Sequence, residues 1–338
     1  MTDPCRPWHV AILIYPHAQM SAVLGLTDLF AVADRLARNR AGGMPPRLRV
    51  SHVGPIAETG RMAVSFDTAA RERAEEADER PDVVILPPSL GDPPSGEAVP
   101  ALAGWLRRRH AAGATLASVC AGGFLLAETG LLDGRPATTH WTCSESFAAR
   151  FPRVRVDTEK LLIDDGDIVT AGGLMAWTDL GLHLLGRYLN RAAMVETARF
   201  LVIDPPGREQ RYYTAFSPRR DHGDAAVLKV QRWLDIQDER AFSVGAMAMQ
   251  AGLEERTFLR RFSAATGLRP VEYCQHLRID RARELLESTN ATVERIGWDV
   301  GYGDPASFRK LFLKLTGLTP SSYRRRFGAR SQADASAP

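Results

Sequence analysis

The chain has 338 residues, of which 45% are hydrophobic, and its formal net charge is +3. This length fits two domains, and this composition excludes a wholly disordered chain. The sequence has no run of eighteen apolar residues and no basic-then-apolar leader, so we expect neither a membrane span nor a signal peptide. Its four cysteines lack paired spacing, which favours a cytoplasmic protein with free thiols, no metal site and no cofactor.

Short apolar strands alternate with helices over residues 8–202, which form the first expected domain. This alternation predicts an α/β domain with a mostly parallel sheet flanked by helices on both faces. Strands are expected at Val10–Tyr15, Leu48–Val53, Asp82–Leu86, Ala114–Val119, Val154–Asp157, Leu161–Ile163 and Ile168–Thr170. Helices are expected at Ser21–Arg38, Gly96–His110, Phe124–Thr129 and Met175–Leu189.

Residues 203–222 differ in character from what precedes them. Because Pro, Gly and charged residues dominate there without a sustained apolar period, this segment is the expected linker. The second expected domain, residues 223–328, is all-α and opens with a helix at Ala225–Ile236. It carries the chain's excess of positive charge, which a DNA phosphate backbone would attract. The polar tail 329–338 is expected to be disordered.

The stretch Phe242–Phe327 contains one helix-turn-helix pattern twice. In each copy a short amphipathic helix leads through a glycine turn, at Gly252 or at Gly301 and Gly303, into a second helix. Two such units in one chain can present helices to successive major grooves on one DNA face, about 34 Å apart. The alternative is a helical interaction module with solvated arginines, and the duplication argues against it.

Capping signals place the helices of both copies. Ser243 and Thr292 are the expected N-caps of the two first helices. Asp304-Pro305 is expected to open the second recognition helix, because a proline in the first turn loses no hydrogen bond. A long helix at Pro270–Ser288 is expected to connect the two copies.

The spine LRIDRARELLESTNATVERI and the run GYGDPASFRKLFLKLTGLTPSSYRRRF resemble the AraC/XylS family of transcription regulators. The resemblance implies two helix-turn-helix subdomains on one connecting helix, bound to double-stranded DNA. Arginine is the commonest reader of guanine, whereas the apolar Leu259, Pro305 and Ala306 would meet thymine methyl groups or nothing. The side chains expected at DNA are Arg256, Thr257 and Arg260 of the helix Glu255–Thr266, and Pro305, Ala306, Arg309 and Lys310 of the second recognition helix.

Cys120 lies between a buried strand and a helix, among small neighbours that include Ala121 and Gly122. This is the design of a nucleophile elbow, and the helix N-terminus is expected to lower the pKa of the thiol. Position at a strand end favours a ligand pocket, because parallel sheets bind ligands at the carboxyl ends of their strands. His140 is a candidate base or pocket donor, and Asp28 a candidate carboxylate partner. The alternative for Cys120 is a buried small hydrophobe.

The segment VCAGGFLLAETGLLDGRPATTHW and the opening VAILIYP resemble the ThiJ/PfpI branch of the class I glutamine amidotransferase-like fold. Together with the C-terminal half, the chain resembles the GlxA-type regulators. Enzymes of that branch place a histidine directly after the cysteine, where this chain has Ala121. Their first-helix acid is commonly Glu, where this chain has Asp28. Both departures favour a pocket that senses a ligand without turnover.

Two functions therefore remain open. The favoured one is a transcription regulator, expected to be a homodimer, whose N-terminal pocket binds a small effector such as an amino acid or amine. Its pocket residues would be Asp28, Cys120, Ala121, Gly122 and His140. The other is a cysteine-dependent hydrolase (amidase, protease or glyoxalase-like) fused to a DNA-binding domain, with Cys120 and His140 as catalytic residues.

Overall fold

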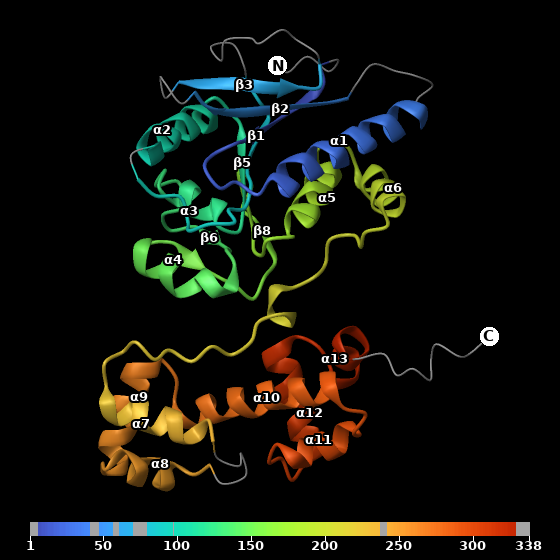
Figure 1. The fold of residues 1–338 in the computed structure, drawn as a ribbon. Coiled ribbons are helices and arrows are strands. Elements are labelled where there is room, and N and C mark those ends of the chain that lie inside the picture. The colour runs from blue at the N-terminus through green and yellow to red at the C-terminus, as the bar shows by residue number, and fades with distance from the viewer. Residues whose placement is uncertain are drawn as a thin grey trace, which may run out of the picture. The chain divides into compact units, whose positions relative to one another are not determined.

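A computed structural model describes residues 6–40, 47–56, 61–69, 80–96, 98–236 and 242–328 (Figure 1). The chain divides into two compact units between Gln210 and Arg211, a point inside the predicted 203–222 linker. The predicted disorder of the tail 329–338 concerns residues outside the described ranges.

The N-terminal unit is built on a seven-stranded sheet with the order β3-β2-β1-β4-β5-β9-β8. Five neighbouring strands, β2 to β9 in that order, are parallel, and the edge strands β3 and β8 run antiparallel to them. The bounds are β1 Trp8–Leu13, β2 Leu48–Pro55, β3 Met62–Asp67, β4 Val83–Leu86, β5 Thr115–Val119, β8 Leu162–Asp164 and β9 Ile168–Ala171. The predicted α/β fold with a mostly parallel sheet is confirmed.

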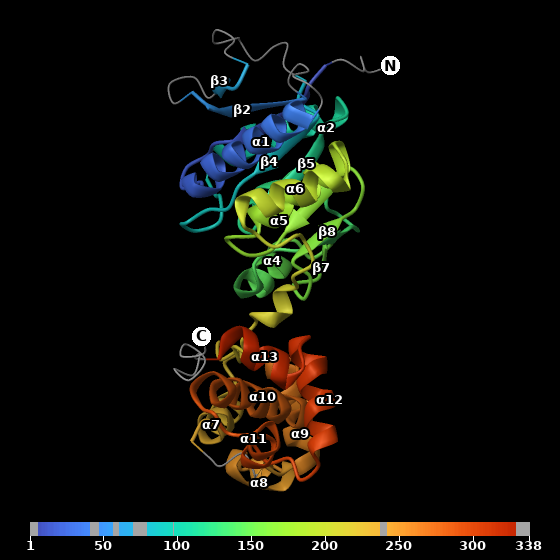
Figure 2. The same cartoon turned by 90° about the vertical axis from the view of Figure 1, so that its right-hand side faces the viewer.

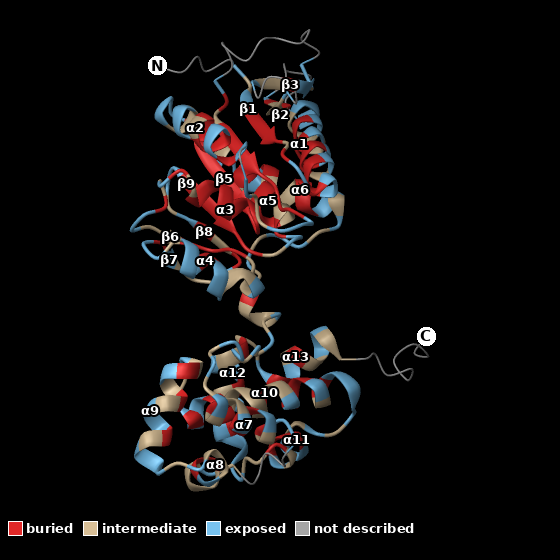
Figure 3. Cartoon of the chain, turned by 60° about the vertical axis from the view of Figure 1, so that its left-hand side comes forward, coloured by how far each residue is buried: buried red, intermediate tan, exposed pale blue. Residues whose placement is uncertain are grey.

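Strand alternation divides the core of this unit between the two faces of the sheet (Figure 3). Val10 and Ile12 pack with helices α1, α5 and α6 on one face, whereas Ala11 and Leu13 pack with α2 and α3 on the other. Successive side chains of a strand point to opposite faces, so both faces of β1 are apolar and buried. The helices are α1 Met20–Arg40, α2 Ala98–Ala111, α3 Gly122–Ala127, α4 Ser144–Arg150, α5 Trp177–Tyr188 and α6 Arg191–Leu201.

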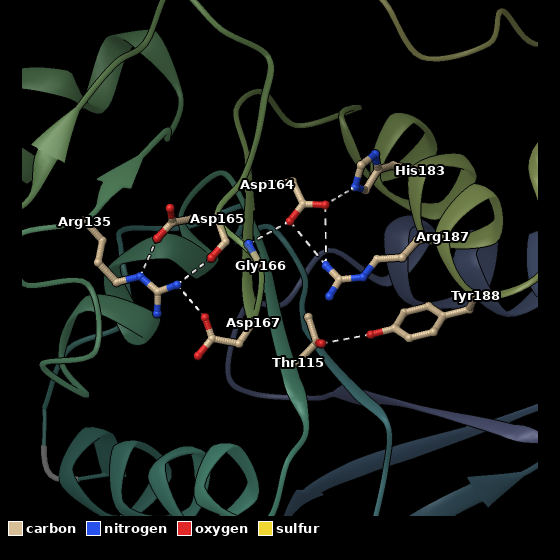
Figure 4. Close-up of polar contacts among 9 residues, drawn as sticks. All are labelled: Thr115, Arg135, Asp164, Asp165, Gly166, Asp167, His183, Arg187 and Tyr188. Carbon is tan, nitrogen blue, oxygen red and sulfur yellow. Dashed lines mark hydrogen bonds and ion pairs between the residues drawn. The ribbon is translucent and has the colours of Figure 1, made fainter. Parts of the chain in front are cut away.

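Ion pairs fix the turn between β8 and β9 (Figure 4). Arg135, which precedes the short two-stranded sheet of β6 (Pro136–Ala137) and β7 (Arg155–Val156), donates to Asp165 and Asp167 on one side of the turn. On the other side Asp164 accepts from His183 of α5 at 2.8 Å. These contacts join the β8–β9 edge of the sheet to the segment before β6 and to helix α5.

The C-terminal unit is entirely helical in its described part and contains two hydrophobic cores. The first core surrounds Phe258 and Phe262, and the second surrounds Phe308 and Phe312. The predicted connecting helix is present with its predicted bounds, and it contributes buried side chains to both cores. The helices are α7 Ala225–Leu234, α8 Val244–Ala251, α9 Glu255–Thr266, α10 Pro270–Ser288, α11 Val293–Asp299, α12 Pro305–Thr316 and α13 Pro320–Phe327.

Candidate DNA interface and ligand site

The two helix-turn-helix units repeat the same backbone chemistry. Gly252 and Gly301, which follow α8 and α11, have φ of 67° and 86°, a left-handed conformation that glycine adopts without steric cost. At the ends of α9 and α12, the hydroxyls of Thr266 and Thr316 each donate to a carbonyl four residues back at 2.8 Å. The duplication seen in the sequence is therefore a duplication of structure.

Side-chain caps start the helices where the sequence predicts them. The Ser243 hydroxyl accepts from the Ala246 N–H at 3.2 Å, and the Thr292 hydroxyl accepts from the Arg295 N–H at 3.1 Å. Asp304 accepts from two N–H groups of the first turn of α12, and Pro305 is the first residue of that helix. Each cap satisfies a donor that would otherwise lack a partner, typically stabilising a helix by about 1 kcal/mol.

The first recognition helix, α9, presents two arginines to solvent. Arg256 and Arg260 are exposed one helical turn apart, and neither side chain has a hydrogen bond or ion pair to any other described residue. Thr257 is half-buried, and Leu259 remains 40% exposed. Arg261, in contrast, donates two hydrogen bonds to the carboxylate of Asp224, at 2.7 and 2.9 Å. Its guanidinium therefore joins α9 to the start of α7.

The second recognition helix, α12, differs in its polar groups. Pro305, Ala306, Arg309 and Lys310 are all exposed. Arg309 forms an ion pair with Glu294 of α11, whereas Lys310 has no such partner in the described part of the chain. In Figure 2, α12 and α9 lie toward the same side of the C-terminal unit. Two helices on one side of a unit are what contact with one DNA face requires.

In the N-terminal unit, the parallel strands end around Cys120. Cys120 follows β5 with φ of 52°, a left-handed conformation that a residue other than glycine adopts at an energetic cost. Its N–H donates to the Ala171 carbonyl at the end of β9 at 2.7 Å. Glycine is required at the next turn, because a Cβ at Gly122 would lie 2.5 Å from the carbonyl oxygen of Leu86 at the end of β4. The predicted strand-to-helix elbow is present.

Burial, rather than the helix N-terminus, has the largest effect on the pKa of the Cys120 thiol. Burial raises the pKa of Cys120 to about 12, and nearby Cys143 acts in the same direction. The backbone N–H groups of Ala121, His140 and Gly173 favour the thiolate but do not offset this effect. The expectation of a lowered pKa is therefore wrong: α3 is only six residues long, and Cys120 is 5% exposed. At neutral pH the thiol is protonated and a weak nucleophile.

The other two predicted pocket side chains, His140 and Asp28, are not hydrogen-bonded to the Cys120 thiol in the part of the chain that the structure describes. The backbone of His140 borders Cys120, but its side chain has other partners. The imidazole Nδ1 accepts from the Thr142 N–H at 3.2 Å, and the imidazole ring stacks on Trp141. Burial lowers the pKa of His140, so the ring is neutral at pH 7. Asp28 is exposed on α1, and within the described ranges no hydrogen bond or ion pair joins its side chain to Cys120 or His140.

Sequence reasoning missed two side chains of this region. Tyr15, after β1, is buried, and its hydroxyl donates to the Pro87 carbonyl after β4. Gln210 is 2% exposed: its Nε2 donates to the carbonyls of Thr139 and Thr158, each at 2.9 Å, and its Oε1 accepts from the Trp141 N–H at 3.0 Å. Gln210 thus holds both sides of the His140 backbone. The sequence around Gln210 has no sustained apolar period, so nothing there predicted a buried side chain.

Within the ranges that the structure describes, none of the helices has the length and apolarity needed to span a bilayer. The same ranges contain no group of three or more His, Cys, Asp or Glu side chains able to hold a metal ion.

Comparison with known proteins gives the same two parts. Residues 24–187 match the DJ-1/PfpI family, and residues 247–326 match a helix-turn-helix domain. The chain is 29% identical over 284 residues to the HTH-type transcriptional regulator CdhR of Pseudomonas aeruginosa, across 83% of this chain and 78% of that protein. It is 29% identical over 227 residues to the HTH-type transcriptional regulator GlxA of Rhizobium meliloti, across 66% of this chain and 69% of that protein.

The fold, the duplicated helix-turn-helix unit and these relatives define a DNA-binding transcription regulator. The chain thus combines a DJ-1/PfpI domain with a following AraC-type helix-turn-helix domain, and it is similar over most of its length to HTH-type regulators at about 29% identity.

Proposed function

We propose that this regulator responds to a small metabolite bound beside Cys120, without chemical turnover, and that it acts as a homodimer. The effector class proposed is an amino acid or amine, as the family resemblance implies. Arg256, Arg260, Arg309 and Lys310 are proposed to contact DNA bases or phosphates, with Thr257, Pro305 and Ala306 beside them.

The electrostatics around Cys120 support sensing over catalysis. A thiol with a raised pKa and a neutral imidazole that is hydrogen-bonded elsewhere do not form the thiolate–imidazolium pair of cysteine hydrolases. The residue after Cys120 is Ala121, which supplies no second base. The remaining backbone N–H groups of Ala121, His140 and Gly173 suit a ligand carboxylate or other hydrogen-bond acceptor.

The observation that carries the proposal is the position of Gln210. Its buried amide holds Thr139 and Trp141, the two neighbours of His140, and a Cβ at Gly172 would lie 2.4 Å from its Nε2. Gln210 is also the last residue of the N-terminal unit. A change in the loops around Cys120 therefore reaches the chain directly before Arg211.

The segment after Arg211 is anchored to the connecting helix α10. The Arg283 guanidinium donates to the Thr214 carbonyl, and the Phe216 N–H donates to Asp280 at 2.8 Å. The Phe216 ring stacks on His276 with 4.7 Å between ring centroids. The segment that the sequence predicts to be a linker thus has contacts with α10 through which strain from the effector site can act.

A titration tests the sensing proposal. A thermal-shift screen of amino acids and amines first identifies a ligand, and calorimetry then measures its affinity with and without operator DNA. A ligand alters DNA affinity only if it binds two arrangements unequally, and DNA must then change ligand affinity by the same factor, typically about 5- to 150-fold. Equal affinities in the two titrations would remove the mechanism.

Two variants separate sensing from catalysis and from simple folding. Cys120→Ser should leave the response of DNA binding to the ligand in place, whereas loss of turnover on a candidate amide or peptide would instead support the hydrolase. Gln210→Met keeps the side-chain length but removes three hydrogen bonds, and it should preserve DNA binding while reducing the ligand's effect on it. Asp204→Asn, an exposed change six residues earlier, is the matched control.

A further inference from the structure

The two helix-turn-helix units are joined where their cores meet on α10. Leu277 packs against the first core, and Ile279 is buried in the second. The residue between them, Arg278, is therefore at the junction. A single helix can bend or twist over its length, so a shared helix alone does not fix the angle between two recognition helices.

Arg278 contacts an aromatic ring on each side of this junction. Its guanidinium carbon lies 5.7 Å from the ring centroid of Phe242, directly before the N-cap of α8, and 5.6 Å from that of Tyr302, in the turn before α12. Both separations are in the range of favourable cation–π contacts. Tyr302 in turn contacts Phe308, a buried residue of the second recognition helix, with 5.6 Å between the ring centroids.

The charge of Arg278 also acts on both cores. Burial raises the pKa of Cys274 in the first core and that of Tyr302 beside the second, and the charge of Arg278 opposes this rise at both groups. One cation is thus held between groups from the two units. Separation of the units would leave this cation without at least one of its rings, a cost that the folding of either unit alone does not involve.

We propose that Arg278 fixes the angle between α9 and α12 and thereby selects the spacing between the two halves of the operator. Insertion or removal of one base pair shifts a half-site by about 3.4 Å along the duplex. Rigidly joined units cannot follow this shift without losing contacts, whereas loosely joined units can. Arg278 itself need not touch DNA, so its role is that of a positioning residue.

The test uses the full chain and an operator selected from random duplex DNA. Fluorescence anisotropy measures Kd on this operator, on versions with one base pair inserted or deleted between the half-sites, and on a version with one half-site scrambled. The variant is Arg278→Met, which keeps most of the stem but removes the cation. Arg281→Met, an exposed arginine on the same helix paired with Glu284, is the matched control for lost charge.

We expect Arg278→Met to weaken binding to the native operator by about 5-fold, the loss expected from one or two cation–π contacts, while the scrambled operator is bound within about 2-fold of the wild type. Its preference for the native spacing should fall by a similar factor, and Arg278→Lys should restore part of that preference. Phe242→Leu and Tyr302→Leu each remove one ring, so they test the same role if Arg278→Met does not fold. An equal loss on every duplex, as for Arg281→Met, or an undiminished spacing preference in all these variants, would overturn the proposal.

Discussion

Glu294 is expected to restrain DNA binding by the second recognition helix, so its neutralisation should tighten binding. Arg309, a proposed DNA contact on α12, is paired with Glu294 of α11 in the free protein. To reach a base or phosphate, the guanidinium must leave this carboxylate, which then stays close to the DNA backbone. Glu294→Gln keeps the shape of the side chain and removes its charge.

The expected gain follows from the exposure of the pair. The side chains of Arg309 and Glu294 are 52% and 53% exposed, so solvent screens their attraction. Exposed pairs typically contribute about 0.2–1 kcal/mol, which corresponds to binding about 1.4- to 5-fold tighter once the competing pair is removed. The gain should shrink at higher salt, because both the pair and the phosphate contact are screened.

A double-mutant cycle separates this effect from a general change in charge. Operator affinity is measured by anisotropy for wild type, Glu294→Gln, Arg309→Ala and the double variant at one salt concentration. Glu284→Gln on α10, which breaks the exposed pair with Arg281, gives the gain from removal of a negative charge elsewhere. Weaker binding by Glu294→Gln, or a gain that persists in full without Arg309, would refute the reasoning.

Three other outcomes are expected. Arg260→Ala should cost about 1–3 kcal/mol on a specific site and relax preference at one base pair. Arg325, in the basic last turn of α13, is expected to contact phosphate, so Arg325→Ala should weaken all sequences alike. Identical uniform losses for the two variants would contradict the assignment. Because burial raises the pKa of Cys120 to about 12, its alkylation by iodoacetamide should be slow at pH 8 and faster as the pH approaches 12. Mass spectrometry follows the labelling, and fast labelling of Cys120 at pH 8 would contradict its burial. Gly122→Ala forces a Cβ to 2.5 Å from a carbonyl oxygen, so overpacking should lower the Tm of the N-terminal unit by about 2–12 °C, while Gly104→Ala, with 3.6 Å to a flexible side chain, should not.

Local patterns explain why much of the fold could be predicted. The apolar run at β1 is buried on both faces, and such a run is typical of a central parallel strand. Ser243, Thr292 and Asp304 are caps whose partners lie two or three residues away, so their signal is contained in a few residues. The turn glycines Gly252 and Gly301 are equally local signals.

Elements that depend on distant partners could not be predicted. The edge strand β3 pairs with β2 along one side only, and the apolar run in its residues Met62–Asp67 is only three residues long. Helix α6 is a different case: only two residues separate it from α5, and its local start signal, the Asn190 side chain that accepts from the Ala193 N–H, was missed in the sequence. Gln210 has partners at positions 139, 141 and 158, far away in sequence, and its segment lacks any apolar period.

The site around Cys120 shows the same limit in its chemistry. The elbow was predictable because small residues after a strand are a local feature, and φ of 52° at Cys120 agrees with it. The direction of the pKa shift was not, because it depends on burial by groups from several strands and on Cys143 from another segment. A motif thus predicts where a side chain lies more reliably than how it ionises.

The two recognition helices are expected to read DNA differently, although their backbone frameworks are duplicated. The first offers Arg256 and Arg260, both exposed and without partners in the described ranges, whereas the second begins with Pro305 and Ala306 and holds its arginine against Glu294. A side chain that makes two hydrogen bonds to a base discriminates against the wrong base by about 1–3 kcal/mol, and apolar contacts discriminate less. Base-by-base substitution of the operator should therefore reveal one half-site that tolerates few changes and one that tolerates many. The second unit would then contribute mainly phosphate contacts and spacing, which is the property that a rigid junction at α10 would protect.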